Sequence, residues 1–290
     1  MNLTERKGGL DLVGPHREQD HTPPLPLPST GTVWRTLGNV NLLLLEDGEI
    51  DPEGVARVYE RRAEHLLRVL GVKVGDTLQA GIVRGCAGIA TVTRVGDASV
   101  ELEVRLTGSP PPPPEVDLIL AIPRPKALRR VVQHAAAVGI RRIDLVNAWR
   151  VEKSYLASPR LDPRALREQA WLGCEQGATT WLPEISVHRL LLPFLLEVLR
   201  LRLAATKPTH LLLAHPSAAR YVEAALPRVD ASATVVAIGP EGGWIPAEIA
   251  TFSELGFIPV RLGTNVLRVE AAVTALLAQL ELLKRVSAQK

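Results

Sequence analysis

A glycine-rich loop is the first stretch of the sequence whose residues could do chemistry. Residues 235–238 are apolar and run into Gly239-Pro240-Glu241-Gly242-Gly243-Trp244, after which a helical pattern begins. Glycines let a ligand approach backbone amides closely, because they carry no side chain. The loop has neither the lysine of a Walker A motif nor the spacing of a dinucleotide fingerprint. Taken alone, it is either a ligand-binding loop or an ordinary tight turn.

Two further loops follow apolar runs in the same way. Residues 211–218 read LLLAHPSA, and residues 261–272 read RLGTNVLRVEAA. Each passes from a strand-like run into a loop and then into a helical pattern. Ligands of open α/β sheets bind beyond the carboxyl ends of the strands. We therefore expect the three loops to form one pocket.

The elements that must position these loops alternate between strand and helix. Asp162 and Pro163 have the residue types of a helix N-cap and first turn. Pro193 either kinks one helix or separates two. Such alternation predicts an α/β fold with a mostly parallel sheet covered by helices. The expected strands are 116–122, 141–146, 210–214, 234–238 and 258–263, and the expected helices are 126–139, 162–178, 189–204, 216–226, 246–256 and 269–286.

The N-terminal part of the chain has a different pattern. Residues 1–31 mix charges with prolines and show no period, which predicts a disordered extension. Residues 32–107 contain short alternating runs and a helical pattern at 55–70 that ends at Gly71, which predicts a small barrel domain. Five consecutive prolines in residues 108–114 form a stiff spacer. We place a domain boundary there and assign residues 115–290 to a second domain.

Composition limits the classes of function. The 290 residues carry a formal charge of +3 and a pI near 9.0, which weakly favours an anionic partner. Cys86 and Cys174 form no CxxC pair, so a disulfide framework and a zinc knuckle are disfavoured, and we expect a cytoplasmic protein. No apolar run reaches about 18 residues, so no membrane span is expected. No set of metal ligands is visible, and we expect no metal.

Two adjacent loops resemble those of a known family. GPEGGW(x)3E at 239–248, followed by LGTNVLRVEAAV at 262–273, resembles the C-terminal signature of the RsmE-type 16S ribosomal RNA uridine-N3 methyltransferases. These belong to the SPOUT superfamily, and their pattern is roughly GPEGG(F)(S)xxE and then LGxxILRxETA. HLLRVLGVKVGD at 65–76 is similar to the family's HxxxVLRxxxGD stretch. The resemblance covers about residues 32–287.

The resemblance implies a fold, a cofactor and a partner. It implies an α/β trefoil knot preceded by a PUA-like β-barrel, acting as a homodimer on N3 of a uridine in small-subunit ribosomal RNA. It also implies that the three loops bind S-adenosylmethionine. The residues carried over for this role are Leu213, Ala214, His215, Ile238, Gly239, Glu241, Gly242, Gly243, Leu262, Gly263, Val266, Leu267 and Arg268.

The reaction suggests three catalytic candidates. Methyl transfer from a sulfonium needs an aligned nitrogen, and the uracil N3 must lose a proton, which spreads negative charge to the carbonyl oxygens. Arg268 is a candidate to stabilise that charge or to contact a phosphate. Glu241 and Glu270 are candidates to orient groups or to accept the proton. Alternatively the glutamates are structural, and Glu270 stabilises the start of the last helix.

Basic side chains are candidates for RNA binding, since phosphate contacts supply affinity. The alternative for each of them is a solvated charged face. The candidates are Arg62, His65, Arg68, Arg124, Lys126 and Arg150.

Three departures from the family pattern leave the target nucleotide open. RPKALRRVVQHAAAVGI replaces a lysine-rich stretch, EQGATTWLP lacks an arginine, and LRVEAA lacks two threonines. Two alternatives therefore stay beside the leading interpretation. One is a SPOUT methyltransferase with another RNA target, and the other is a catalytically silent RNA-binding protein.

Overall fold

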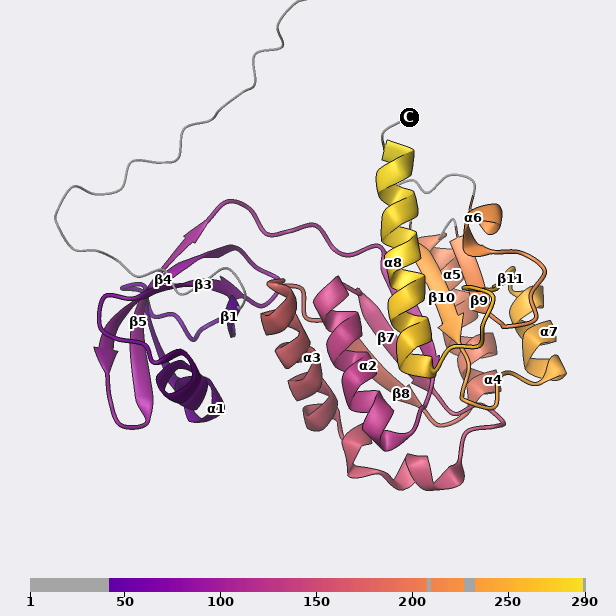
Figure 1. The fold of residues 1–290 in the computed structure, drawn as a ribbon, viewed down its shortest axis with the longest axis horizontal. Coiled ribbons are helices and arrows are strands. Elements are labelled where there is room, and N and C mark those ends of the chain that lie inside the picture. The colour runs from indigo at the N-terminus through magenta and orange to yellow at the C-terminus, as the bar shows by residue number, and fades with distance from the viewer. Residues whose placement is uncertain (1–41, 208–209, 227–232, 289–290) are drawn as a thin grey trace, which may run out of the picture. The chain divides into compact units, whose positions relative to one another are not determined.

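The computed structural model describes residues 42–207, 210–226 and 233–288 (Figure 1). The expected extension at 1–31 and the start of the expected barrel at 32–41 lie outside the described residues. All described residues belong to one unit, Trp34–Lys290. This unit contains a six-stranded and a five-stranded sheet.

The six-stranded sheet is parallel throughout. Its order is β11-β9-β10-β6-β7-β8, and every neighbouring pair runs in the same direction. The α/β fold with a parallel sheet is therefore confirmed, and the carboxyl ends of all six strands lie at one edge. The strands are β6 Val116–Ala121, β7 Arg142–Val146, β8 Glu184–His188, β9 His210–Ala214, β10 Thr234–Ile238 and β11 Ile258–Val260.

Helices cover both faces of this sheet. Figure 1 shows α2, α3 and α8 on one face, with α4 (Leu191–Pro193) and α5 (Arg200–Thr206) behind the strands. The Asp162 carboxylate accepts hydrogen bonds from the amides of Arg164 and Ala165 at 2.9 and 3.3 Å, so the predicted cap of α3 is confirmed. The helices are α2 Pro125–Val138, α3 Pro163–Gly177, α6 Val222–Ala225, α7 Pro246–Glu254 and α8 Val269–Ala288, with short 3-10 turns at η2 Lys153–Ala157 and η3 Pro159–Leu161.

The segment around Pro193 is one helix. It consists of α4 Leu191–Pro193, a π-helical turn η4 Phe194–Leu199, and α5 Arg200–Thr206. Pro193 lies in the first turn, where its missing N–H breaks no intrahelical bond. The backbone is right-handed helical at Pro193 and Phe194 and continues through η4 into α5, so Pro193 does not divide the segment into two helices.

The helix predicted over residues 216–226 is wrong in its first half. Only α6 is helical, because the preceding backbone pairs with the edge of the sheet. The Arg220 carbonyl accepts a hydrogen bond of 2.8 Å from the Arg261 amide, and Tyr221 forms a parallel bridge with Arg261. These bonds use backbone groups that a helix would need.

The five-stranded sheet is mixed. Its order is β1-β3-β4-β5-β2, with β1 parallel to β3 and all other pairs antiparallel. Leu45, Val58 and Leu102 are fully buried in its own core. The strands are β1 Leu42–Leu45, β2 Val55–Tyr59, β3 Thr77–Ile82, β4 Ala87–Val95 and β5 Ser99–Thr107.

The helix predicted over residues 55–70 is wrong at its start. Residues 55–59 form β2, which pairs antiparallel with β5 and buries Ala56 and Val58. Glu60 then adopts a φ of 51°, which separates the strand from the helical segments α1 Glu60–Glu64 and η1 His65–Leu70. Gly71, with a φ of 60°, ends the helix as predicted.

Residues 108–114 lie between β5 and β6 and form neither helix nor strand. In the part of the chain that the structure describes, no helix combines the length and apolarity needed to cross a membrane.

Candidate functional site

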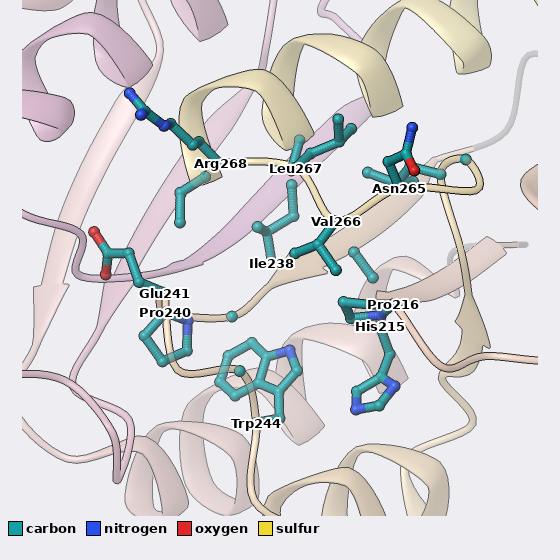
Figure 2. Close-up of a pocket in the computed structure, with 17 residues that line it drawn as sticks. His215, Pro216, Ile238, Pro240, Glu241, Trp244, Asn265, Val266, Leu267 and Arg268 are labelled. Atoms are coloured by element: carbon teal, nitrogen blue, oxygen red, sulfur yellow. The ribbon is translucent and has the colours of Figure 1, made fainter.

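A cavity of about 330 Å³ opens at the carboxyl ends of β9, β10 and β11 (Figure 2). The three strands are neighbours in the sheet, so the loops that follow them converge. This agrees with the expectation that the three loops form one pocket. The lining residues are Ala214, His215, Pro216, Ile238, Gly239, Pro240, Glu241, Gly243, Trp244, Leu262, Gly263, Asn265, Val266, Leu267, Arg268, Val269 and Ala272.

Most residues that the sequence suggested for cofactor binding lie on this cavity. Leu213 does not, because its side chain is fully buried within β9. Gly242 is also absent from the lining, and its carbonyl accepts a hydrogen bond of 2.6 Å from Arg150 Nη1. The eleven that line the cavity are Ala214, His215, Ile238, Gly239, Glu241, Gly243, Leu262, Gly263, Val266, Leu267 and Arg268.

Sequence reasoning missed several lining residues. Trp244 and Asn265 are the polar ones, while Pro216, Pro240, Val269 and Ala272 add apolar wall. Trp244 directly follows Gly243 in the motif, so its position in the sequence could have indicated a place on the cavity. Ala272 is the last residue of the 261–272 stretch, and it lines the cavity near the start of α8.

Trp244 forms one wall of the cavity. Its side chain is only 3% exposed and packs edge-on against Phe252, with ring centroids 5.0 Å apart. The indole Nε1 has no hydrogen-bond partner among the described residues. Figure 2 shows the nitrogen-bearing edge of the ring turned toward the centre of the lining residues. A buried donor without a partner is costly, so this N–H is suited to a ligand acceptor.

Gly239 makes room for that ring. A Cβ atom at this position would lie 3.1 Å from Trp244 Cε2 and Nε1, which is closer than ordinary van der Waals contact. The conformation at Gly243 is a second constraint, because its φ of +73° favours glycine. The glycines of the loop therefore serve a close approach and a left-handed turn.

Glu241 links the cavity to the segment after β6. Its Oε1 accepts a hydrogen bond of 3.1 Å from the Arg124 amide, and Arg124 Nε lies 3.9 Å from the same oxygen. Arg124 itself is exposed. The carboxylate thus has a structural contact while it also faces the cavity.

Glu248 holds two segments together. It is 5% exposed, its Oε2 accepts from the Ile245 amide at 2.9 Å, and its Oε1 accepts from the Trp149 amide at 2.8 Å. The first bond caps the start of α7. The second fixes the segment after β7 against the cavity loop.

Arg268 and Glu270 differ in position. Arg268 is exposed, lines the cavity and forms no salt bridge among the described residues. Figure 2 shows Arg268 and Glu241 on the same side of the cavity. Glu270 is half-buried in the first turn of α8 and does not line the cavity.

The six predicted RNA contacts fall into two groups. Arg62, His65 and Arg68 lie on α1 and η1. Arg62 is bound to Glu49, with one bond of 2.8 Å, and donates to the Leu44 carbonyl, so it is occupied within the fold. Arg68 is exposed and pairs with Glu64 at 3.0 Å, while His65 is half-buried.

The second group lies at the carboxyl edge. Arg124 follows β6 and Arg150 follows β7, both exposed, and Lys126 is exposed in the first turn of α2. Arg124 contacts Glu241 and Arg150 contacts Gly242, so both cations adjoin the glycine-rich loop. Here the structure brings basic residues to the cavity loop.

A buried ionic cluster lies within the sheet. Asp144 in β7 is fully buried, its Oδ2 accepts from Arg202 Nη1 at 2.5 Å, and its Oδ1 lies 2.8 Å from His188 Nε2. Burial alone would raise the pKa of Asp144, but the hydrogen bonds with His188 and Arg202 outweigh burial and hold the pKa below its usual value. The cluster joins β7, β8 and α5.

A comparison with known families decides what kind of site this is. A model described as an RNA methyltransferase domain matches residues 110–281. The chain belongs to this RNA methyltransferase family. The matched segment contains the six-stranded sheet and every residue of the cavity.

Curated relatives match over most of their length. The ribosomal RNA small subunit methyltransferase E of Treponema pallidum is 29% identical over 242 residues, covering 81% of this chain and 88% of the relative. The ribosomal RNA small subunit methyltransferase E 1 of Borreliella burgdorferi is 24% identical over 236 residues, covering 81% of this chain and 95% of the relative.

Solved structures share the fold. A methyltransferase from Legionella pneumophila, in complex with bound SAM, superposes with a TM-score of 0.69 at 23% identity and covers 84% of this chain and 98% of its own. A ribosomal RNA small subunit methyltransferase E from Neisseria gonorrhoeae, bound to S-adenosyl methionine, gives a TM-score of 0.67 at 23% identity with the same coverage.

The geometry suits an RNA methyltransferase family member. Such an enzyme needs a pocket for a methyl donor and a surface for a polyanion. The carboxyl edge of the sheet offers a cavity after β9, β10 and β11, and exposed cations after β6 and β7. Both features adjoin the glycine-rich loop.

Proposed function

We propose that the chain is an S-adenosylmethionine-dependent methyltransferase acting on N3 of a uridine in 16S ribosomal RNA. The observation that carries this proposal is the cavity between loops 239–244 and 262–268, in a chain of the RNA methyltransferase family. The curated relatives named as small-subunit methyltransferase E support the substrate. The neighbours solved with SAM support the cofactor.

The cavity residues fit this cofactor. A volume of about 330 Å³ lies within the range of about 300–1,000 Å³ that is usual for ligand sites. Ile238, Val266 and Leu267 offer apolar wall, and the unpartnered Trp244 Nε1 offers a hydrogen-bond donor. When bound, S-adenosylmethionine supplies an activated methyl group. The backbone of Gly239 and Gly243 lies open to a polar nucleoside.

Arg268 is the principal catalytic residue of the proposed reaction. Loss of the uridine N3 proton places negative charge on the neighbouring carbonyl oxygens, and a guanidinium beside them stabilises that charge. Arg268 lines the cavity, is exposed and has no ionic partner among the described residues, so its charge is available.

The two glutamates have different roles in this proposal. Glu241 lines the cavity, so it is better placed than Glu270 to accept the N3 proton or to orient the base. Glu270 lies in the first turn of α8, where a carboxylate favours the helix dipole. We assign it this structural role.

RNA binding is assigned mainly to the carboxyl edge. Arg124, Lys126 and Arg150 are exposed near the glycine-rich loop and would contact phosphates. His65 and Arg68 lie on η1 and would extend the contact. Arg62 is held by Glu49, so we expect it to shape this surface rather than bind RNA.

We further propose the domain organisation that the resemblance implies. Residues 32–107 are the PUA-like β-barrel, 108–114 the linker and 115–290 the trefoil-knot domain. The separate core of the five-stranded sheet and the match beginning at residue 110 support this division. We also propose a cytoplasmic homodimer, which the family resemblance supports.

Calorimetric titration with S-adenosylmethionine tests the cofactor assignment. We expect saturable binding with one site per chain. No heat of binding at millimolar cofactor would overturn the proposal, and RNA binding without cofactor binding would favour a silent RNA-binding protein.

Mass mapping of 16S ribosomal RNA tests the substrate. We expect RNA from a strain that lacks the protein to have lost one methyl group from a uridine N3, and the purified protein to restore it. An unchanged uridine with a loss at another base would overturn the target and favour the alternative RNA substrate.

A further inference from the structure

Trp149 is an exposed aromatic residue at the same edge of the sheet as the cavity. It follows β7 by three residues, and its side chain is 80% exposed. This is the largest exposed fraction among the large hydrophobic side chains that the structure describes. Trp171 and Trp244 are buried, and Trp181 is half-buried with Arg84 5.2 Å from its ring.

The backbone that carries Trp149 is held in place. Its amide donates to the buried Glu248 carboxylate at 2.8 Å, and the adjacent Arg150 donates to the Gly242 carbonyl at 2.6 Å. Before it, Asn147 Nδ2 donates to the Arg189 carbonyl at 3.0 Å. An indole mounted on such a backbone is positioned in advance for a partner, although it packs on little of its own chain.

Three exposed arginines share this half of the sheet edge with Trp149. Arg124, Arg150 and Arg189 are exposed and follow the adjacent strands β6, β7 and β8. Arg124 and Arg150 both contact the glycine-rich loop, at Glu241 and Gly242. A flat aromatic face among arginines matches single-stranded RNA, whose bases stack on aromatic rings while its phosphates bind cations. A second copy of this chain that contacted this face through a two-fold axis would bring its own arginines against them.

We propose that Trp149 is a stacking platform for an RNA base that flanks the methylated nucleotide. This inference rests on the proposed function and deepens it by naming how single-stranded RNA is held. The indole receives the face of an unpaired base, and Arg124 and Arg150 bind the phosphates on either side. The cavity itself does not include Trp149, so cofactor binding is independent of the ring.

Substitution of Trp149 tests the platform. The probe is a fluorescein-labelled decamer of uridines, compared with a decamer of the same length whose central positions are abasic. We expect Trp149→Ala to bind the uridine decamer roughly tenfold more weakly, because stacking on a base is lost. Trp149→Phe should retain most of the affinity, and all variants should bind the abasic decamer equally.

Controls separate stacking from other effects. Val138→Ala, at an exposed position near the end of α2, should leave the affinity for both decamers unchanged. Wild-type affinity of Trp149→Ala for the uridine decamer would overturn the inference. An equal loss with both decamers would also overturn it, since the base would then play no part. So would a lower molar mass in light scattering, because the ring would then be covered by a second copy.

Failure of the proposed function would look different. If the wild-type protein takes up no S-adenosylmethionine but binds the uridine decamer in a Trp149-dependent manner, the methyltransferase assignment fails and the platform stands. If the cofactor binds equally to wild type and Trp149→Ala while their RNA affinities are the same, the platform fails and the methyltransferase assignment stands.

Discussion

Two halves of one sheet edge have different surfaces. After β11, β9 and β10, the loops line a cavity with largely apolar walls. After β6, β7 and β8, the same edge presents Arg124, Trp149, Arg150 and Arg189 to solvent. The strands of both halves are parallel and hydrogen-bonded in one sheet, so the difference lies in the loops.

The loops differ in length and in side chains. Seven residues, 239–245, separate β10 from α7, and their glycines let the backbone curve toward Trp244. Only residues 122–124 separate β6 from α2, so little backbone is available to enclose a ligand; Ile122 and Pro123 are buried, and Arg124 projects to solvent. The sheet therefore supplies one frame, and loop composition decides whether it binds a small nucleoside or a polyanion.

The buried ionic cluster of Asp144 joins two strands of the cation-rich half, β7 and β8. Asp144→Asn would leave the partly buried Arg202 without its counter-charge, and we expect about 3 kcal/mol of lost unfolding free energy at pH 7. Because the folded pKa of Asp144 is lowered, its contribution is present above about pH 4, the range of its unfolded pKa, and is lost as the pH falls through the folded pKa. Urea denaturation at pH 7 and pH 3 measures both effects.

A surface pair is the control for the buried cluster. Glu64→Gln removes the exposed partner of Arg68 and should change the unfolding free energy by less than about 0.5 kcal/mol. Equal effects of the two substitutions would contradict the importance of the buried cluster, as would an Asp144→Asn effect that persists undiminished at pH 3.

The cavity half is expected to contain the catalytic charge. Arg268→Ala should lower kcat by about 10²–10³, because charge stabilisation in the transition state is lost. The affinity for S-adenosylmethionine should change less than about threefold, and Arg268→Lys should restore part of kcat. Single-turnover methyl transfer and calorimetry measure the two quantities. A change confined to the KM for RNA would contradict a catalytic role and would make Arg268 an RNA-binding residue.

Substitutions at two glycines of the glycine-rich loop should affect the two halves of the sheet edge differently. Gly239→Val would force the Trp244 ring to move and should weaken S-adenosylmethionine binding by roughly 10- to 100-fold. Gly242→Ala would bring its Cβ to 3.2 Å from Arg150 Cδ, which a flexible side chain can accommodate. It should leave cofactor affinity within about threefold and weaken RNA binding slightly. Equal cofactor losses in both variants would show that the loop acts as one unit.

The main features of the fold were predictable because helix-capping residues and the apolar pattern of the sequence indicated the same elements. Asp162 caps α3 and Gly139 ends α2 as residue type suggests. The predicted helix over 55–70 was wrong, because β5 recruits residues 55–59 into a sheet. The segment after His215 likewise pairs with Arg261 rather than forming helix. Both errors depend on partners distant in the sequence, which periodicity cannot reveal.

The loops that form the site were predictable from the sequence, whereas the positions and partners of several of its side chains were not. Glycine motifs marked the loops that line the cavity, but they did not indicate that Trp244 would provide a wall. Arg62 was expected to bind RNA, yet its partner Glu49 is visible only after folding. Trp149 follows an ordinary strand, and nothing in its neighbourhood of the sequence indicates an exposed ring.

Glu248 connects the two halves through a single carboxylate. One oxygen holds the amide at the start of α7, beside the cavity loop, and the other holds the amide of Trp149. If cofactor binding changes the affinity for RNA through this contact, RNA binding must change the affinity for the cofactor by the same factor. The buried glutamate thus ties the backbone of the cavity half to the backbone of the cation-rich half within a single side chain.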